Sequence, residues 1–293
     1  MQYVFSVAVL LLVFSGLTQA ASLTSSGYSQ NFDSMGTAGT TLPADWSIWK
    51  VGTSHSAWAT SITANGAADS VSAMTSAGTS LVSALLDSGI TTSTKNANAY
   101  NIAHAATPND RVLTTSPTGV DGSAIQLSLT NNTGSALSNL AISYDIVKFY
   151  DGNKQSTIDS TFPAGEELPG YELFYSVNGG SWANVAVLNP VNTSDGIHPV
   201  IPVGAINANG VNGPVDYSVT SISNAVVSLG TSWGAGQTLS LRWVDDNAVN
   251  ISADQIIGLN NVSVSAVPEA GTYAMFLAGL GLIGCVTRRR NRR

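Results

Sequence analysis

The chain has 293 residues, of which 44% are hydrophobic and only 10% are charged, well below the ~25% of ordinary soluble domains. Seventeen acidic side chains face six basic ones ahead of Glu269, and the other five basic residues are arginines in the last six positions. An acidic body without clustered Lys and Arg excludes nucleic-acid binding, and a single cysteine, Cys285, excludes a disulfide framework, a cysteine zinc site or a cysteine nucleophile ahead of the tail.

Residues 1–20 have the pattern of a signal peptide. An apolar run at 4–17 is followed by Thr18-Gln19-Ala20, which puts small residues at the positions that signal peptidase reads. The run is too short for a spanning helix, so we expect a signal helix that is removed on export.

Residues 21–266 are predicted to form one β-domain. Ile125, Leu127 and Leu129 alternate with polar residues, which is the pattern of a half-buried strand. The turn residues Asn178-Gly179-Gly180 predict a tight hairpin. The expected strands are 28–32, 46–51, 124–130, 140–149, 171–177, 182–188, 238–244 and 256–264.

The stretch 57–98 differs from the rest of the body because it is rich in small residues. Leu81, Val82, Leu85 and Leu86 have helical spacing, so this insertion is predicted to hold one short helix or to form a long loop over the domain. Many short strands joined by polar turns predict an all-β fold, an antiparallel β-sandwich of the lectin-like jelly-roll type.

The end of the chain, 267–293, has the pattern of a membrane tail. Residues 271–287 are uncharged and reach the lower limit of the ~17–25 residues that cross a bilayer. Arginines follow at 288–293, and the positive-inside rule places them in the cytoplasm. The body is therefore expected outside the inner membrane, in agreement with the signal peptide.

Three parts occur in order in this tail: a Pro-Glu pair, a Gly-rich apolar segment and an arginine cluster. The residues that carry the two ends are Val267, Pro268, Glu269, Arg288, Arg289 and Arg290. This order resembles the PEP-CTERM sorting signal, although Ala270 stands where that family usually has a second proline. The resemblance implies that an exosortase, a membrane-embedded cysteine transpeptidase, cuts near Pro268 and releases or re-attaches the body at the cell surface or in the extracellular matrix. A plain anchor that is never processed is the alternative.

Several short sequence motifs of the body resemble motifs in the bodies of proteins that carry such tails. They include Asn31-Phe32-Asp33, Asp110-Arg111-Val112-Leu113 and Gly258-Leu259-Asn260-Asn261-Val262. Those bodies resemble lectin-type jelly rolls, mostly without an assigned activity, so this resemblance implies a fold more than a function.

Four oxygen-bearing side chains within ten residues are candidate calcium ligands. They are Asp245, Asp246, Asn247 and Asp254. Carboxylate and amide oxygens suit hard cations, but the spacing is not that of an EF-hand loop. The alternative is a turn in which Asp and Asn cap backbone amides, and no other cofactor is predicted.

Catalytic patterns are weak, and we expect no enzyme. His55, His104 and His198 form no metal-binding motif, and no G-x-S-x-G elbow precedes a helix. A glycosidase or lyase requires two carboxylates at a controlled separation, for which Asp145 and Asp245 are the candidates.

Aromatic residues supply the candidate glycan contacts. Trp243 is expected in the core, whereas Trp46 and Trp49, three positions apart, should lie on opposite faces of a strand. Trp58 and Trp233 lie beside Gly or small residues and are predicted to be exposed for glycan contact.

These observations predict an exported envelope or matrix protein with a structural or carbohydrate-binding body. Its expected partners are signal peptidase, exosortase, the inner membrane and extracellular polysaccharide. A secreted polysaccharide-active enzyme is the alternative, and adhesive protein contacts, which would require an exposed apolar patch, are a third reading.

Overall fold

A computed structural model describes the body of the chain and isolated residues of the tail. The described residues are 20–51, 71–78, 99–104, 107–117, 120, 122–150, 170–191, 194–201, 218–246, 255–267, 280 and 283. The predicted signal helix, the insertion helix around 81–86 and most of the membrane segment lie outside them. Within the described residues, no helix is both long and apolar enough to cross a bilayer.

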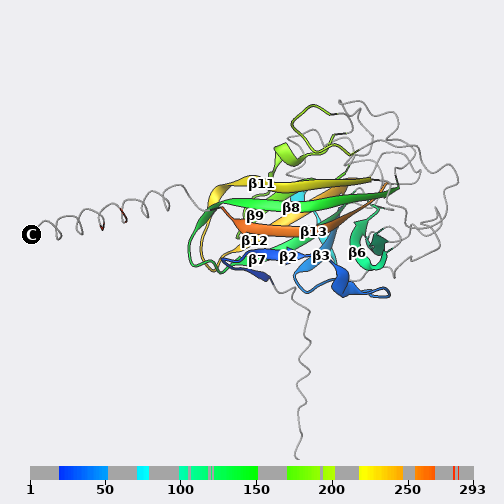
Figure 1. Ribbon diagram of the computed structural model, residues 1–293, viewed down its shortest axis with the longest axis horizontal. Helices are drawn as coiled ribbons and strands as arrows, with labels where there is room; N and C mark the ends of the chain where they lie inside the picture. Colours follow the sequence, from blue (N-terminus) through cyan, green and yellow to red (C-terminus); the bar gives the residue numbers. More distant parts are fainter. Residues whose placement is uncertain are drawn as a thin grey trace, which may run out of the picture.

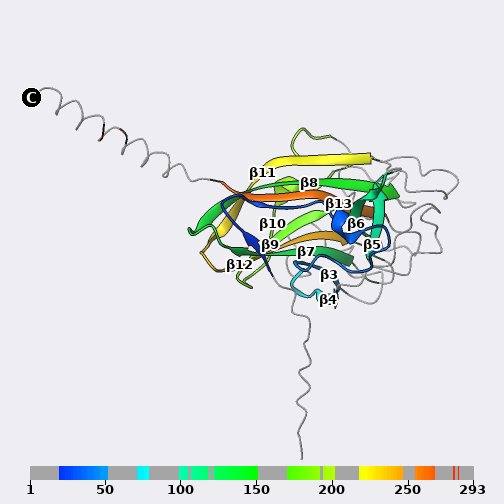
Figure 2. The same cartoon turned by 60° about the horizontal axis from the view of Figure 1, so that its bottom comes forward.

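The body is a sandwich of two β-sheets (Figures 1 and 2). The first sheet has the order β10 (Ala183–Asn184), β9 (Glu172–Val177), β12 (Thr238–Asp246), β7 (Gly122–Asn131), β3 (Trp46–Val51) and β4 (Thr75–Gly78). The second has the order β11 (Ser218–Trp233), β8 (Leu137–Tyr150), β13 (Ile256–Ala266), β6 (Thr107–Thr115) and β5 (Ala99–His104).

Two short strands complete the sheets at the start of the body. β1 (Ala21–Leu23) pairs in parallel with β7, and β2 (Tyr28–Gln30) pairs antiparallel with β13. Two 3-10 helices, Asp33–Met35 and Ala186–Leu188, lie in the connections. The predicted all-β antiparallel sandwich is confirmed, while its jelly-roll and lectin-like character stays a prediction.

The core follows from period-two alternation on facing strands. Trp46 and Trp243 are fully buried and stack with their ring centroids 5.7 Å apart. Tyr144, from the opposite sheet, meets Trp243 edge-on at 5.6 Å. The prediction that Trp243 belongs to the core is confirmed. Each buried aromatic ring removes about 150–250 Å² of surface from water, so this cluster holds the two sheets together.

The expected strands agree with the observed ones to different degrees. β3 has the predicted ends, and the predicted strand at 182–188 shortens to β10 followed by a 3-10 helix. The sequence prediction missed β1, β4, β5, β6 and β11. β11 has Ser, Thr or Asn at half of its sixteen positions and carries little apolar alternation, which explains why the longest strand was missed.

Candidate functional site

A break in one edge of β13 forms the candidate site. β13 pairs with β8 on one side, and on the other it pairs with β6 through Ile257–Leu259 and with β2 through Val262–Val264. Asn260 and Asn261 lie between these two pairings. The strand bulges there against β8, and Asn261 takes a left-handed conformation with φ of 50°.

The chain leaves β2 beside this bulge. The Gln30 side-chain oxygen accepts a hydrogen bond from the Phe32 backbone amide at 2.7 Å, and Phe32 itself has φ of 63°. The Asn31 side-chain oxygen accepts from the Asp33 amide at 3.2 Å. These local bonds turn the backbone away from β13, because Asn and Gln side chains compete with the strand ladder for backbone donors.

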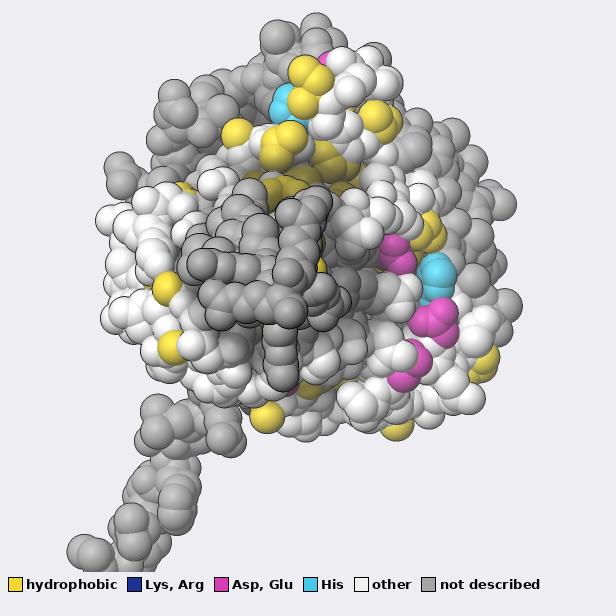
Figure 3. All heavy atoms as spheres, turned by 60° about the vertical axis from the view of Figure 1, so that its left-hand side comes forward, with side chains coloured by type: hydrophobic (Ala, Val, Ile, Leu, Met, Phe, Trp, Pro, Cys, Tyr) yellow, Lys and Arg dark blue, Asp and Glu magenta, His cyan; other side chains and the backbone are white. Residues whose placement is uncertain are grey.

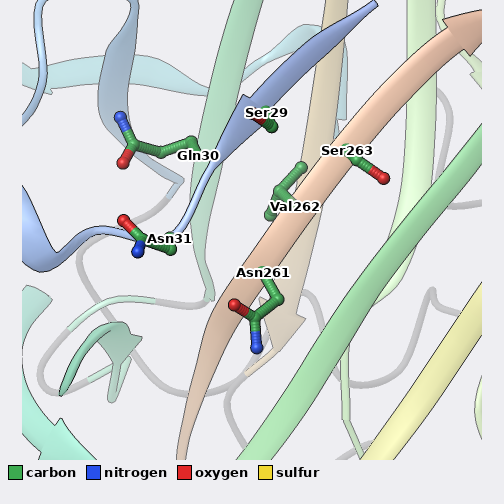
Figure 4. Close-up of a pocket in the computed structure, with 6 residues that line it drawn as sticks. All are labelled: Ser29, Gln30, Asn31, Asn261, Val262 and Ser263. Carbon is green, nitrogen blue, oxygen red and sulfur yellow. The ribbon is translucent and has the colours of Figure 1, made fainter.

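The divergence of the two strands opens a hollow of about 380 Å³, which we call the amide groove. It is lined by Ser29, Gln30, Asn31, Asn261, Val262 and Ser263. Figure 4 shows the two runs side by side, with the amide groups of Asn31 and Asn261 at the end where the strands diverge. Five of the six lining side chains are hydroxyls or amides, and none is charged.

Carboxylates surround the groove and orient its amides. The Asn31 amide donates to Asp33 at 2.7 Å, and the Asn261 amide donates to Asp145 at 2.8 Å. Asn260 donates to Asp110 at 3.0 Å. Bonds to ionised acceptors are stronger than neutral ones, so the amide groups are held in fixed orientations.

Most of the described basic side chains are buried and so bring no positive charge to the surface around the groove. Of the four basic residues in the described part of the chain, Arg111 and Lys148 are fully buried and Arg242 is 3% exposed, which leaves Lys50. Figure 3 shows one face of the molecule, where acidic side chains gather around a histidine at the right and none of the coloured side chains is Lys or Arg. Among the described residues, the charged side chains bonded to the asparagines of the groove are therefore the carboxylates of Asp33, Asp110 and Asp145.

Arg111 supports the groove from beneath. Its backbone amide donates to Asp33 at 2.9 Å, and its guanidinium donates to the side chain and the carbonyl of Asn101, both at 2.7 Å. Burial lowers the pKa of Arg111, while Asp110 and Asp33 counteract that effect. Arg111 thus ties the turn after β2 to β5 and β6.

The three short sequence motifs named in the sequence analysis lie together at this site. Asn31-Phe32-Asp33, Asp110-Arg111 and Asn260-Asn261 come from distant parts of the chain and are joined by the hydrogen bonds above. Gly258 belongs to the last motif, and a Cβ there would lie 2.4 Å from the Val112 side chain, so the close approach of β13 and β6 requires glycine. The sequence analysis singled out these short motifs but did not indicate that they form one site. It gave no indication that Ser29, Gln30 or Ser263 would line a site.

The predicted glycan contact Trp233 is wrong. Its side chain is fully buried, its indole N–H donates to the Gln237 carbonyl at 2.9 Å, and its own carbonyl accepts from Asn131. The glycine that follows suggested an exposed loop, but Trp233 ends β11 and packs into the main core. Trp58 lies outside the described residues.

Trp49 forms part of an aromatic pair that the sequence did not predict. As expected, Trp46 and Trp49 lie on opposite faces of β3. The Arg242 guanidinium lies 3.8 Å from the Trp49 ring centroid and 4.2 Å from that of Trp182. It also donates to Gln126 and to the Val71 carbonyl, and burial lowers its pKa to about 9. One face of each ring is therefore occupied by an internal cation.

Asp245 does not lie in an exposed loop, contrary to its role in the predicted calcium site. It is fully buried near the end of β12, where it accepts hydrogen bonds from Thr115 at 2.6 Å and Gln255 at 3.0 Å. The Tyr171 hydroxyl lies 2.8 Å from Thr115, and burial together with the Asp245 charge raises the pKa of Tyr171. This network joins the two sheets inside the sandwich.

The remaining calcium candidates stay a prediction. Asp246 ends β12, while Asn247 and Asp254 lie outside the described residues. Among the residues that the structure describes, no group of three or more His, Cys, Asp or Glu side chains is placed to hold a metal ion.

The two carboxylates proposed for catalysis do not face one cleft. Asp145 lies beside the amide groove, whereas Asp245 is enclosed between the sheets. His104 pairs with Asp110 and His198 with Asp195, each through Nδ1, and His55 lies outside the described residues.

Comparison with known proteins identifies the end of the chain. Residues 266–293 match the PEP-CTERM protein-sorting motif. The resemblance based on Val267, Pro268 and the arginines is thereby confirmed, and the motif implies export and exosortase-dependent sorting to the cell surface. Pro268, Glu269 and Arg288–Arg290 lie outside the described residues.

The body is similar to solved structures only at low TM-scores in the comparisons that follow. No curated protein matches the chain. The Agl-KA catalytic domain is similar at a TM-score of 0.22 and 14% identity, over 54% of this chain and 22% of that one. The catalytic domain of GH87 alpha-1,3-glucanase, in complex with tetrasaccharides, gives a TM-score of 0.23 and 12% identity, over 55% and 22%.

A carbohydrate-binding module, TmCBM27, with specific mannan recognition, gives a TM-score of 0.22 and 14% identity, over 58% of this chain and 81% of that one. The chain thus spans about a fifth of the length of the first two structures. Likeness at these TM-scores supports no conclusion about the function of the body.

Proposed function

We propose that this exosortase-sorted protein binds neutral polysaccharide of the envelope or matrix in the amide groove, without catalysing a reaction. The observation that carries the proposal is a hollow lined mainly by hydroxyl and amide side chains, in a body whose described basic residues are mostly buried. Its volume lies within the ~300–1,000 Å³ typical of ligand sites.

Amide side chains suit a sugar because a hydroxyl is both a donor and an acceptor. Asn and Gln present an acceptor oxygen and two N–H donors, so one amide can match two neighbouring hydroxyls. In the groove, Asp33 and Asp145 hold the Asn31 and Asn261 amides in place. Fixed orientation reduces the entropy lost when the ligand binds.

The surrounding charge favours a neutral ligand over an anionic one. Asp33, Asp110 and Asp145 lie around the groove, and a uronate or sulfate placed there would meet like charge. Such a groove binds one short segment weakly. A polymer that engages many copies on a cell surface gains avidity.

The test is binding of the full-length chain, in mild detergent, to immobilised neutral glucan, mannan and galactan, with alginate and heparin as anionic probes. We expect retention on a neutral polymer and none on the anionic ones. Replacing Asn261→Gly keeps a residue that accepts the left-handed backbone and removes the amide. The variant should bind about tenfold more weakly, since lost hydrogen bonds are worth about 1–1.5 kcal/mol.

Asn178→Gly is the matched control, because Asn178 has φ of 51° in the turn after β9, outside the groove. Its binding should equal that of the wild type. Failure to bind any neutral polymer, or equal loss in both variants, contradicts the proposal. Binding that disappears with EDTA would move the site to the 245–254 segment, and release of shortened polymer would favour the polysaccharide-active enzyme instead.

A further inference from the structure

Exposed apolar side chains gather at one edge of the sandwich. The large hydrophobic residues that are exposed in the described chain are Val187, Ile197, Val219, Val226, Leu280 and Ile283. The last two belong to the sorting tail. The other four lie on β11 or in the 186–199 segment beside it, and Ile197 and Val226 are 69% and 59% exposed. Among the described residues of the body, the exposed large apolar side chains therefore gather along this edge.

A hollow of about 370 Å³ lies along this edge. Its lining includes Val187, Leu188, Ile197 and Pro199 from the segment after β10, and Ile222, Ala225 and Val226 from β11. Figure 3 shows hydrophobic side chains around a hollow in the upper part of that face. We call β11 and this hollow the β11 edge. Contiguous apolar surface of this kind marks interaction sites on soluble domains.

β11 is unlike the other edge strands of the two sheets. β4 and β10 have four and two residues, and β5 is almost entirely buried. β11 has sixteen residues, and in the described part of the chain it pairs with β8 alone. Figure 2 shows it at the upper margin of the sandwich. An edge strand exposes backbone donors and acceptors that can pair with another strand.

The strand also lacks the residues that normally protect an edge. It contains no Lys, Arg, Asp, Glu or Pro. A bulge between Ile222 and Ala225 bends the strand, but Ala225–Ser228 then pairs regularly with β8 from Ile142 back to Asn139. The Tyr175 hydroxyl donates to the Ser228 carbonyl and accepts from the Gly230 backbone amide at the end of this segment. The regular, uncharged segment left on the outer side is therefore Ala225–Val227, with Val226 exposed.

We propose that the β11 edge pairs with the β11 edge of a second copy of this chain, in antiparallel orientation around a two-fold axis at Val226, within the segment Ala225–Val227. Such an interface is self-complementary, because the same segment meets itself. The acidic body would repel a second copy over most of its surface, whereas β11 brings no charge to the axis. Pairing would continue the five-stranded path β11-β8-β13-β6-β5 into the partner and cover both hollows.

The absence of charge makes this edge compatible with a second copy of itself. An antiparallel pair places like residues close together at the axis, which penalises charged segments and leaves a neutral one unaffected. The proposal does not depend on glycan binding, since the amide groove lies at β13 and β2.

The test uses disulfide trapping in the full-length chain. Cys285→Ser removes the native thiol, and Val226→Cys then places one thiol at the proposed axis. Two cysteines join only when their Cβ atoms come within about 4.5 Å, so a paired edge should yield a covalent dimer under mild oxidation. Ser135→Cys, an exposed position in the turn between β7 and β8, should stay monomeric.

Val226→Lys provides a second measurement that does not depend on oxidation. In analytical ultracentrifugation the wild type should sediment as a dimer, and Val226→Lys should dissociate at least tenfold more readily while its circular dichroism spectrum stays that of the wild type. Equal trapping of Val226→Cys and Ser135→Cys, a monomeric wild type, or a dimer that persists in Val226→Lys would overturn the proposal. The last result would assign the association to the tail.

Discussion

The amide groove and the β11 edge are built around the same local device in one sheet. Each contains an asparagine in the left-handed conformation at a bulge against β8, Asn261 with φ of 50° and Asn224 with φ of 49°. The Asn261 side-chain amide donates to the Asp145 carboxylate of β8, whereas the Asn224 backbone N–H donates to the hydroxyl of Ser143, two residues earlier in β8. Two bulges on either side of one strand thus open two hollows.

The difference lies in what surrounds each bulge. Beside Asn261, β2 supplies Ser29 and Gln30, and the turn after it supplies Asn31 and Asp33. Beside Asn224, the segment after β10 supplies Val187, Ile197 and Pro199. The bulge therefore sets the position of each hollow. The segment of the same chain that lies beside the bulge determines whether the hollow is polar and suits a sugar, or apolar and suits another strand.

The largest expected effect concerns the scaffold that both hollows share. Asp245→Ala would leave buried Thr115 and Gln255 groups without their acceptor, and we expect a loss of about 3 kcal/mol in the free energy of unfolding. Denaturant unfolding measures this loss, with the exposed Asp195→Asn as a control of nearly unchanged midpoint. If Asp245→Ala unfolds at the wild-type midpoint, the two sites do not depend on this inter-sheet network.

Two buried tyrosines test whether a hydroxyl contributes to the free energy of unfolding only where it has a hydrogen-bond partner. The same premise underlies the comparison of the polar groove with the apolar edge. The Tyr171 hydroxyl lies 2.8 Å from Thr115 and from the Ile257 carbonyl, whereas the Tyr144 hydroxyl has no hydrogen-bond partner among the described residues. Tyr171→Phe should cost about 1–2 kcal/mol, and Tyr144→Phe should cost nothing or stabilise the protein slightly. Thermal unfolding of both variants measures the difference, and equal losses would contradict this account.

Added salt should change the affinity of self-association at the β11 edge a few-fold and leave the affinity of the groove for a neutral polymer nearly unchanged. Sodium sulfate strengthens apolar burial, so self-association at the β11 edge should tighten as its concentration rises. Binding of a neutral polymer in the groove forms hydrogen bonds between uncharged partners and should change little. Sedimentation and polymer retention in the same buffers measure both. If sodium sulfate changed self-association and polymer retention by the same factor, the two hollows would not differ in the way proposed.

Prediction from sequence succeeded where local pattern is sufficient. β3 was predicted with its observed ends, because Trp46, Ile48 and their neighbours carry a strong strand signal. β11 was missed because Ser and Thr occupy both faces of much of the strand. Trp233 was misplaced because the following glycine suggested a loop, and burial of its ring depends on Gln237 and Asn131.

Local order along the chain was enough to establish the sorting tail, the acidic and disulfide-free body, and its strand-rich character, because motif order, charge and alternation are properties of neighbouring residues. Contacts across the fold determined that Asn31, Asp110 and Asn260 share one site, that Asp245 faces inward, and that apolar side chains gather along β11. These outcomes depend on which strands pair and in what register, and a shift of one residue would exchange the buried and exposed faces of every strand.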